Sequence, residues 1–126
     1  MIDPALTSVN EFRLKLYPND FGLVRSFYED KLGFVVTHEW DNGPNNKGVM
    51  FLVGNTTLEL LSPPDGYKQV QGADVSWEVT DVEGLWEKLK DNTPVVHELR
   101  HNSWGDTSFR ITDPEGFNIS FFTKDN

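Results

Sequence analysis

An internal repeat is the feature that most restricts how this chain can fold. Asp20 and Asp81 each stand at the start of a predicted helix and are 61 positions apart (81 − 20). Leu14 corresponds in the same way to Val75 (14 + 61). A chance echo is the alternative, but the matched order of the predicted elements favours duplication of one unit. Neither copy could bury its sheet alone, so we expect the two to share a core.

The first copy, about residues 10–61, predicts the order β-α-β-β-β. Alternating polar and apolar residues at 11–17 indicate a half-buried strand, and apolar side chains at helical spacing follow over 20–32. Three more strands are expected at 34–40, 49–53 and 57–61. Turn residues separate them, because Asp, Asn and Gly favour the turn conformations.

The second copy, about residues 73–123, repeats that order after a Pro- and Gly-containing linker at 62–72. We expect strands at 74–79, 95–101, 107–111 and 117–122, and a helix whose apolar stripe is Val82, Leu85, Trp86 and Leu89. The fold class is therefore α+β. The two paired βαβββ modules should form one domain, a curved mixed sheet around a groove with helices on the outer face.

Charge and composition exclude several function classes. Eleven Lys and Arg against twenty Asp and Glu give 11 − 20 = −9. Nucleic acid is not an expected partner, because a phosphate backbone needs clustered Lys and Arg. An anionic membrane surface is disfavoured for the same reason. Aromatics at 13% supply apolar mass for a packed core.

The absence of cysteine excludes a disulfide framework, a thiolate zinc site and a cysteine nucleophile. It is compatible with a reducing compartment. No basic region followed by an apolar stretch marks a signal peptide at residues 1–12, and the longest apolar run, 49–53, is too short to span a bilayer. We expect a cytoplasmic protein.

Four stretches resemble a known family. They are Ser26–Phe34 (SFYEDKLGF), Leu58–Leu61 (LELL), Trp104-Gly105, and Asp113–Phe117 (DPEGF). In this order and spacing the chain resembles the vicinal oxygen chelate superfamily, which includes glyoxalase I, the bleomycin resistance proteins and the extradiol dioxygenases. The resemblance covers roughly residues 10–123 and implies paired βαβββ modules. It does not imply one function, because the fold hosts several chemistries.

The resemblance also implies four metal-ligand positions, which in metal-dependent members hold His, Glu or Gln. Here they fall on Arg13, Glu59, Asp74 and Ser120. A guanidinium stays protonated and has no acceptor, and a neutral serine is a poor ligand for a divalent ion. We therefore expect no metal and no cofactor, and no glyoxalase or dioxygenase mechanism that depends on the ion.

Two interpretations of Arg13 are open. In the first, the guanidinium replaces the charge of the missing metal and is held by Glu59 and Asp74 in charge-assisted pairs. In the second, Arg13 points to solvent at the mouth of the groove. The histidines do not restore a metal site, because His97 and His101 should share one strand face about 13 Å apart.

Alternation assigns the two faces of each strand. The residues expected beneath the helices are Phe12, Leu14, Leu16, Val75, Trp77, Val79, Ile119 and Phe121. The candidate ligand-binding residues of the groove are Arg13, Glu59, Asp74, Glu78, Ser120, Trp40, Trp104, His101 and Phe122. This mixture of aromatic and carboxylate groups suits a flat aromatic or cationic ligand.

Three functions remain open. The first is a metal-free binding protein, similar to the bleomycin resistance branch, that sequesters an aromatic or cationic compound such as an antibiotic. The second is a glyoxalase-like lyase, isomerase or dioxygenase with an altered site, in which Glu59 or Asp74 is the general base. The third is a structural or regulatory module. By resemblance we expect a homodimer, in which residues 1–9 form an arm that clasps or exchanges with the partner.

Overall fold

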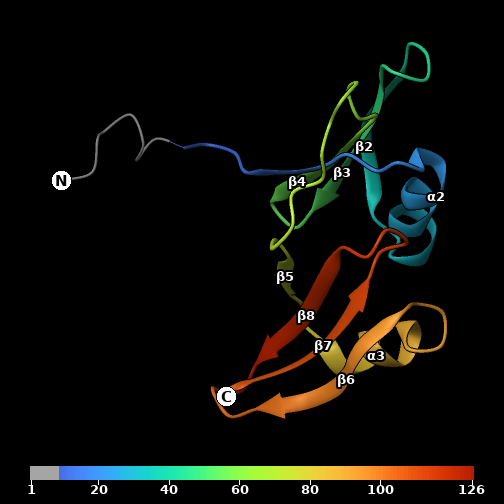
Figure 1. Cartoon of the computed structure of the whole chain (residues 1–126). Coiled ribbons are helices and arrows are strands. Elements are labelled where there is room, and N and C mark those ends of the chain that lie inside the picture. Colours follow the sequence, from blue (N-terminus) through green and yellow to red (C-terminus); the bar gives the residue numbers. More distant parts are fainter. Residues whose placement is uncertain (1–8) are drawn as a thin grey trace.

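The computed structural model describes residues 9–126, and its strands form two four-stranded sheets (Figure 1). The first sheet has the order β1-β4-β3-β2 and consists of β1 (Arg13–Leu16), β2 (Val35–Asp41), β3 (Lys47–Val53) and β4 (Thr56–Leu61). The second has the order β5-β8-β7-β6 and consists of β5 (Val75–Glu78), β6 (Val95–Asn102), β7 (Asp106–Thr112) and β8 (Asn118–Lys124). In each sheet the first and last strands of the module pair in parallel, and the other neighbours are antiparallel. The predicted α+β fold of two βαβββ modules is confirmed.

The pairing register reproduces the sequence repeat. In the first sheet Leu14 lies opposite Leu58, and in the second Val75 lies opposite Ile119. Both members of the pair are shifted by the same 61 positions (14 + 61 and 58 + 61). The repeat is therefore visible in single cross-strand contacts as well as in the order of elements.

One helical segment follows the first strand of each module. These segments are α2 (Phe21–Ser26), which continues directly as the π-helix η1 (Phe27–Lys31), and α3 (Val82–Leu89). Each begins with an aspartate cap: Asp20 accepts from the Leu23 N–H at 3.1 Å, and Asp81 accepts from the Gly84 N–H at 3.0 Å. The expected helix over 20–32 thus changes to wider π turns at Phe27.

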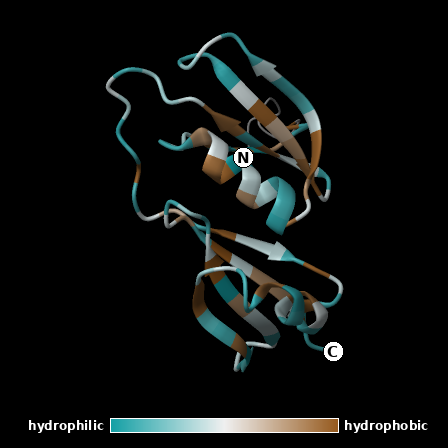
Figure 2. Ribbon diagram, turned by 90° about the vertical axis from the view of Figure 1, so that its right-hand side faces the viewer, coloured by the Kyte–Doolittle hydropathy of each residue, from teal (hydrophilic) through white to brown (hydrophobic). Residues whose placement is uncertain are grey.

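The two helical segments lie on the same side of the molecule and cover one face of each sheet (Figures 1 and 2). The inward residues of both sheets and both helical segments make one hydrophobic core. Its buried members are Val24, Phe27, Tyr28, Val49, Phe51, Leu58, Leu60, Val82, Leu89, Phe109, Ile111, Ile119 and Phe121. Trp86 packs on Phe109, with ring centroids 5.2 Å apart, as its place on the helical stripe predicts.

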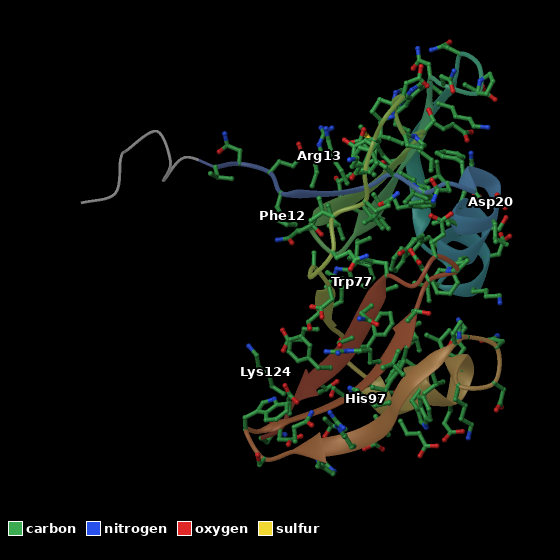
Figure 3. All side chains as sticks on the ribbon, viewed as in Figure 1. Phe12, Arg13, Asp20, Trp77, His97 and Lys124 are labelled. Carbon is green, nitrogen blue, oxygen red and sulfur yellow. The ribbon has the colours of Figure 1, made fainter. Side chains whose placement is uncertain are left out.

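Phe12 is a correction to the predicted core. It precedes β1, whose pairing with β4 begins at Arg13, and its side chain is 64% exposed. The alternation that predicted burial continues one residue beyond the end of the strand. Phe12 and Arg13 lie where the chain enters the first sheet (Figure 3).

The sequence motifs of the two modules meet at their junction. The buried hydroxyl of Tyr28 donates to Asp113 Oδ2 at 2.8 Å. The carboxylate of Glu115 accepts the backbone N–H groups of Asn19 and Asp20 at 2.9 and 2.7 Å, just before α2. The FY pair and the DPEG turn are thus two halves of one polar junction that fixes the modules against each other.

Residues 62–74, which include the predicted linker, contain no helix or strand. The segment is attached to the end of β1: Gln69 Nε2 donates to the Tyr17 carbonyl at 2.6 Å, and Tyr67 packs on the Tyr17 ring at 4.5 Å between centroids. Of the predicted N-terminal arm, residues 1–8 lie outside the described residues. Over residues 9–126 no helix has the length and apolar character needed to cross a bilayer.

Candidate functional site

Each sheet has one face that points away from the helices, and these two surfaces carry most of the predicted site. The first open face, on β1–β4, consists of Arg13, Lys15, Val35, His38, Trp40, Met50, Leu52, Thr57, Glu59 and Leu61. The second open face, on β5–β8, consists of Ser76, Glu78, His97, Arg100, Asn102, Asp106, Ser108, Arg110, Ser120, Phe122 and Lys124. Their composition differs, because half of the residues on the first face are apolar and it holds one carboxylate, whereas nearly all residues on the second are polar or charged.

Glu59 is the most unusual group of the first open face. It lies on β4, and its side chain is only 6% exposed. Its Oε1 atom has no hydrogen-bond partner within the described residues. A buried carboxylate oxygen without a donor is costly, so this atom is a place where a bound N–H group would be stabilised.

Arg13 lies beside Glu59, because β1 is the parallel neighbour of β4. Its Nη1 is 3.7 Å from Glu59 Oε1, which is an ion-pair contact but too long for a hydrogen bond. The guanidinium donates instead to Glu11, at 2.9 Å from Nε and 3.2 Å from Nη2. This exposed pair lowers the pKa of Glu11 and raises that of Arg13, in both cases mainly through the hydrogen bond between them.

Asp74 does not join this pair. It lies one residue before β5 and is exposed, and within residues 9–126 Arg13 forms ion pairs with Glu11 and Glu59 only. The expectation that Asp74 also holds Arg13 is therefore wrong for this chain. The two modules meet through η1 and the DPEG turn, and this arrangement does not bring the start of β5 to Arg13.

Trp40 forms a wall of the first open face. It lies opposite Gly48 on β3, and its ring covers that glycine so closely that a Cβ there would overlap the indole. His38 lies beside it, with ring centroids 5.6 Å apart. The glycine thus lets the indole lie flat over the sheet, where it presents an aromatic surface.

Ser120 lies on the second open face and is buried. Its hydroxyl accepts a hydrogen bond from Arg110 Nε at 2.9 Å, and the two residues are directly opposite on β7 and β8. The sequence analysis selected Trp40, Trp104 and His101 from the inner hairpins and did not select Arg110. The signal was present, since alternation with buried Phe109 and Ile111 places Arg110 on the same face as Ser120.

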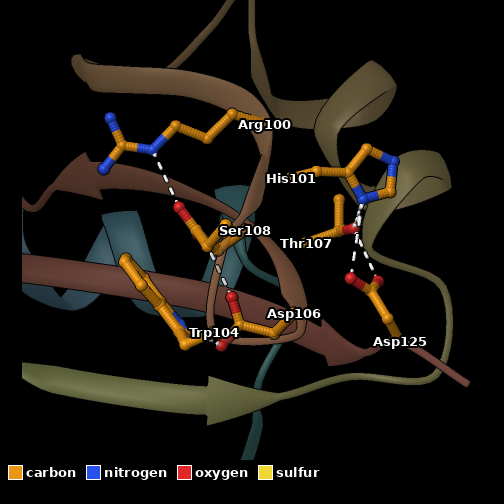
Figure 4. Close-up of polar contacts among 8 residues, drawn as sticks. Arg100, His101, Trp104, Asp106, Thr107, Ser108 and Asp125 are labelled. Carbon is orange, nitrogen blue, oxygen red and sulfur yellow. Dashed lines mark hydrogen bonds and ion pairs between the residues drawn. The ribbon is translucent and has the colours of Figure 1, made fainter.

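Glu78 and Phe122 are direct neighbours on the second open face. Glu78 is exposed and lies 3.9 Å from Lys124 Nζ, whereas Phe122 is half-buried. Trp104 lies in the turn between β6 and β7 with 72% of its surface exposed, and its Nε1 donates to Asp106 Oδ2 at 3.0 Å. Glu78 and Phe122 therefore lie on the second open face, and Figure 4 shows the contact of Trp104 with Asp106.

His101 is not on this face. It lies opposite Thr107, whereas His97 lies opposite Arg110, and these two β7 residues are three apart and therefore point to opposite sides. A register shift between His97 and Arg100 separates the two histidines, which were expected on one face. Thr107 Oγ1 lies 2.7 Å from His101 Nδ1 and donates to Asp125, away from the second open face (Figure 4).

A cavity of about 630 Å³ lies at the junction of the modules, beside the predicted groove residues. None of the nine predicted site residues lines it. Its walls include Lys15 and Tyr17 from the end of β1, Tyr67 and Gln69 from the linker, and Phe117 from the DPEG turn. The predicted residues lie instead mainly on open sheet surfaces.

A divalent metal does not fit the four family positions. Arg13 brings a cation without an acceptor, and Ser120 is engaged by a second arginine, Arg110. Glu59 and Asp74 are the two possible oxygen ligands, but no group of three or more His, Asp or Glu side chains in the described part of the chain is placed to hold an ion.

The family model described as the Glyoxalase/Bleomycin resistance protein/Dioxygenase superfamily matches residues 12–121. The chain therefore belongs to this superfamily. None of the curated proteins compared with the chain matches it.

Solved structures share the fold at low sequence identity. A superfamily member from Sphaerobacter thermophilus DSM 20745 is 18% identical with a TM-score of 0.78, over 94% of this chain and 99% of that one. Lactoylglutathione lyase from Agrobacterium tumefaciens is 21% identical with a TM-score of 0.72, over 92% and 93%. TioX from Micromonospora sp. ML1 is 16% identical with a TM-score of 0.75, over 92% and 99%.

Proposed function

We propose that this chain is a small-molecule-binding protein that sequesters an aromatic or cationic compound without a metal. Glu59 Oε1 is the observation that carries this proposal, because it is a buried carboxylate oxygen with no hydrogen-bond donor in residues 9–126. An ammonium or amidinium group would supply that donor in a charge-assisted hydrogen bond. An antibiotic with a basic group is one compound of this class.

The surroundings of Glu59 support a ligand with a flat apolar part. Met50 lies directly opposite Glu59 on β3, and Leu52 and Leu61 lie in the neighbouring rows. Trp40, Gly48 and Leu61 form one row across β2, β3 and β4. Because Gly48 has no side chain, the indole of Trp40 covers its position and offers a face next to Leu61. An aromatic ring bound here would remove apolar surface from water while its basic group reaches the carboxylate.

The donor set supports the metal-free part of the proposal. No group of three or more His, Asp or Glu side chains in residues 9–126 is placed to hold a divalent ion, whereas an ammonium group needs only the one carboxylate of Glu59. Ligand binding requires the Arg13 side chain to move aside, which is inexpensive because the side chain is 41% exposed and its other partner, Glu11, is exposed too.

We also propose that two copies associate at the β2 edge of the first open face, two strands away from Glu59 on β4. Val35 and Leu52 are directly opposite each other there and are 64% and 50% exposed. Exposed apolar side chains of this size in one region are typical of contact surfaces. Light scattering after size exclusion tests this: a mass of one chain at micromolar concentration contradicts it.

The second candidate function is an enzyme of the lyase, isomerase or dioxygenase type. Glu59 favours it through the same observation, because a buried carboxylate without a donor is suited to accept a proton from a bound substrate. Turnover that disappears in Glu59→Gln and depends on an added divalent ion would establish the enzyme. Binding without turnover favours sequestration.

The proposal is tested with 1-naphthylmethylammonium, which combines a flat ring with an ammonium group. Its binding should quench tryptophan fluorescence and weaken as salt is raised. Glu59→Gln should weaken binding at least tenfold. Glu29→Gln is the matched control, because Glu29 carries the same charge but lies on η1 in an ion pair with Arg25 at 3.2 Å, and it should change the affinity less than twofold. Equal losses in both variants would show that only the net charge matters and would refute the site.

A further inference from the structure

The second open face carries two arginines that form no ion pair within residues 9–126. The chain has four arginines, and Arg13 and Arg25 both contact carboxylates, at 2.9 Å (Glu11) and 3.2 Å (Glu29) among others. Arg100 and Arg110 contact no carboxylate of residues 9–126 within 4.0 Å. In a chain with a net charge of −9, an arginine without a carboxylate needs an explanation.

Both arginines are held by neutral oxygen atoms that leave the ends of their guanidinium groups available. Arg110 Nε donates to Ser120 Oγ at 2.9 Å, and Arg100 Nε donates to Asn102 Oδ1 at 3.2 Å. No hydrogen bond to another described residue uses the Nη atoms of either side chain. The two arginines lie in neighbouring rows on one face, since Arg110 is two residues from Ser108, which lies opposite Arg100.

Asn102, the acceptor of Arg100, is itself held by two hydrogen bonds. Asn102 Nδ2 donates to Asp106 Oδ1 at 2.7 Å and to Ser108 Oγ at 2.8 Å, and Asp106 Oδ2 accepts from Trp104 (Figure 4). The one carboxylate in this network is therefore occupied by neutral donors. The network orients Arg100 and Trp104 together without neutralising the arginine, which is the arrangement of a preorganised anion site.

Two aromatic side chains belong to the same part of the second sheet. Phe122, half-buried on β8, lies opposite Ser108, so it is next to both arginine rows. Trp104 is exposed at the end of the β6–β7 hairpin and is held by its bond to Asp106. A planar ring can stack on such faces while a planar oxyanion meets the guanidinium ends.

We propose that the second open face binds an aromatic carboxylate, with the carboxylate on the Nη atoms of Arg110 and Arg100 and the ring against Phe122. A guanidinium end presents two parallel N–H groups to two carboxylate oxygens, and this geometry selects a planar oxyanion. This proposal does not depend on the proposed function, because it uses residues of the second sheet alone. Together the two open faces recognise opposite charges.

The test measures binding of 2-naphthoate by calorimetry and tryptophan quenching. Arg110→Gln should weaken binding at least tenfold and Arg100→Gln threefold or more. Arg25→Gln is the matched control, because this substitution removes the same charge from α2, where Arg25 forms ion pairs with Glu29 and Glu39. The control should change the affinity less than twofold. Phe122→Leu should weaken 2-naphthoate binding and leave acetate unaffected.

Several outcomes would overturn this proposal. They are no binding of 2-naphthoate to the native protein at millimolar concentration, equal losses in Arg110→Gln and Arg25→Gln, and acetate binding as tightly as 2-naphthoate. Glu59→Gln separates the two proposals: it should weaken binding of the naphthyl ammonium probe at least tenfold and preserve that of 2-naphthoate. A loss of both ligands in Glu59→Gln, with normal folding by circular dichroism, would contradict an independent anion site.

Discussion

Replacing Tyr28 with phenylalanine should destabilise the protein far more than the loss of one oxygen atom suggests. Tyr28 is fully buried, and its hydroxyl donates to Asp113 Oδ2 at 2.8 Å. Asp113 is 3% exposed, and its Oδ1 accepts from Glu115 N at 2.9 Å and Phe117 N at 3.1 Å. Tyr28→Phe therefore leaves Oδ2 of a buried carboxyl group without its hydroxyl donor.

A hydrogen bond to a charged group contributes about 1.5–3 kcal/mol, so we expect the free energy of unfolding to fall by about 2 kcal/mol. With a urea m-value of about 2 kcal/mol/M, the midpoint should move down by about 1 M. The packing of the ring should be retained, because its contact with Phe27 at 5.1 Å involves no hydroxyl. Unfolding is followed by far-ultraviolet circular dichroism and tryptophan fluorescence together.

Tyr17→Phe is the matched control. The hydroxyl of Tyr17 makes no hydrogen bond within the described part of the chain; the contacts of this residue are its carbonyl with Gln69 and its ring with Tyr67. This variant should unfold within about 0.5 kcal/mol of the native protein. A Tyr28→Phe variant as stable as Tyr17→Phe would refute the view that the FY and DPEG motifs are joined by an energetically important hydrogen bond.

Three further predictions concern stability and the first open face. Burial is the main cause that raises the pKa of Tyr28 above its ordinary value near 10, and the nearby Asp113 charge is the second. The unfolded chain therefore loses the Tyr28 proton at a lower pH than the folded protein, so the urea midpoint should fall as pH rises above about 10. The fall should be less steep in Tyr28→Phe, which lacks this proton. Gly48→Ala should displace the Trp40 indole, shift the emission maximum and reduce binding of the naphthyl ammonium probe, whereas unchanged emission would contradict the close packing. Asp81→Ala should cost about 1 kcal/mol by removing the cap of α3, measured as a lower urea midpoint, and no change would show that the Gly84 N–H needs no such partner.

The sequence predicted the fold well because its signals are local and repeated. Alternation placed Leu14 and Val75 inward, and the structure gives both the same partner position in their sheets. Residue type and the apolar stripes behind it predicted a cap at Asn19 or Asp20 and another at Asp81, and the structure shows Asp20 and Asp81 as the caps. These signals depend on neighbours a few positions away, so one chain suffices to find them.

The candidate site was less predictable because it depends on where strands begin, shift and meet. Phe12 was placed in the core because alternation does not show where pairing stops. His101 was assigned to the wrong face because a register shift in β6 leaves no mark in the residue pattern. Asp74 was expected beside Arg13 because the repeat shows that two positions correspond and not how the modules are turned toward each other.

Arg110 was overlooked although the sequence contained its signal. It alternates with Phe109 and Ile111, which are buried, so its side chain belongs to the open face of the second sheet. The hydrogen bond with Ser120 and the absence of a carboxylate partner among residues 9–126 emerge only in three dimensions. The sequence analysis chose aromatic, carboxylate and metal-position residues for the groove, and Arg110 belongs to none of these groups.

The most direct test of a metal-free binding function is one affinity measured under two conditions. The dissociation constant of 1-naphthylmethylammonium is determined for protein treated with a chelator. It is determined again for separate samples of the same protein with one equivalent of zinc, nickel, manganese or iron(II). We predict the same affinity within twofold, because Glu59 supplies the charge for the ammonium group and no group of three or more His, Asp or Glu side chains in residues 9–126 is placed to hold a divalent cation. Binding that appears only after a metal is added would contradict the account.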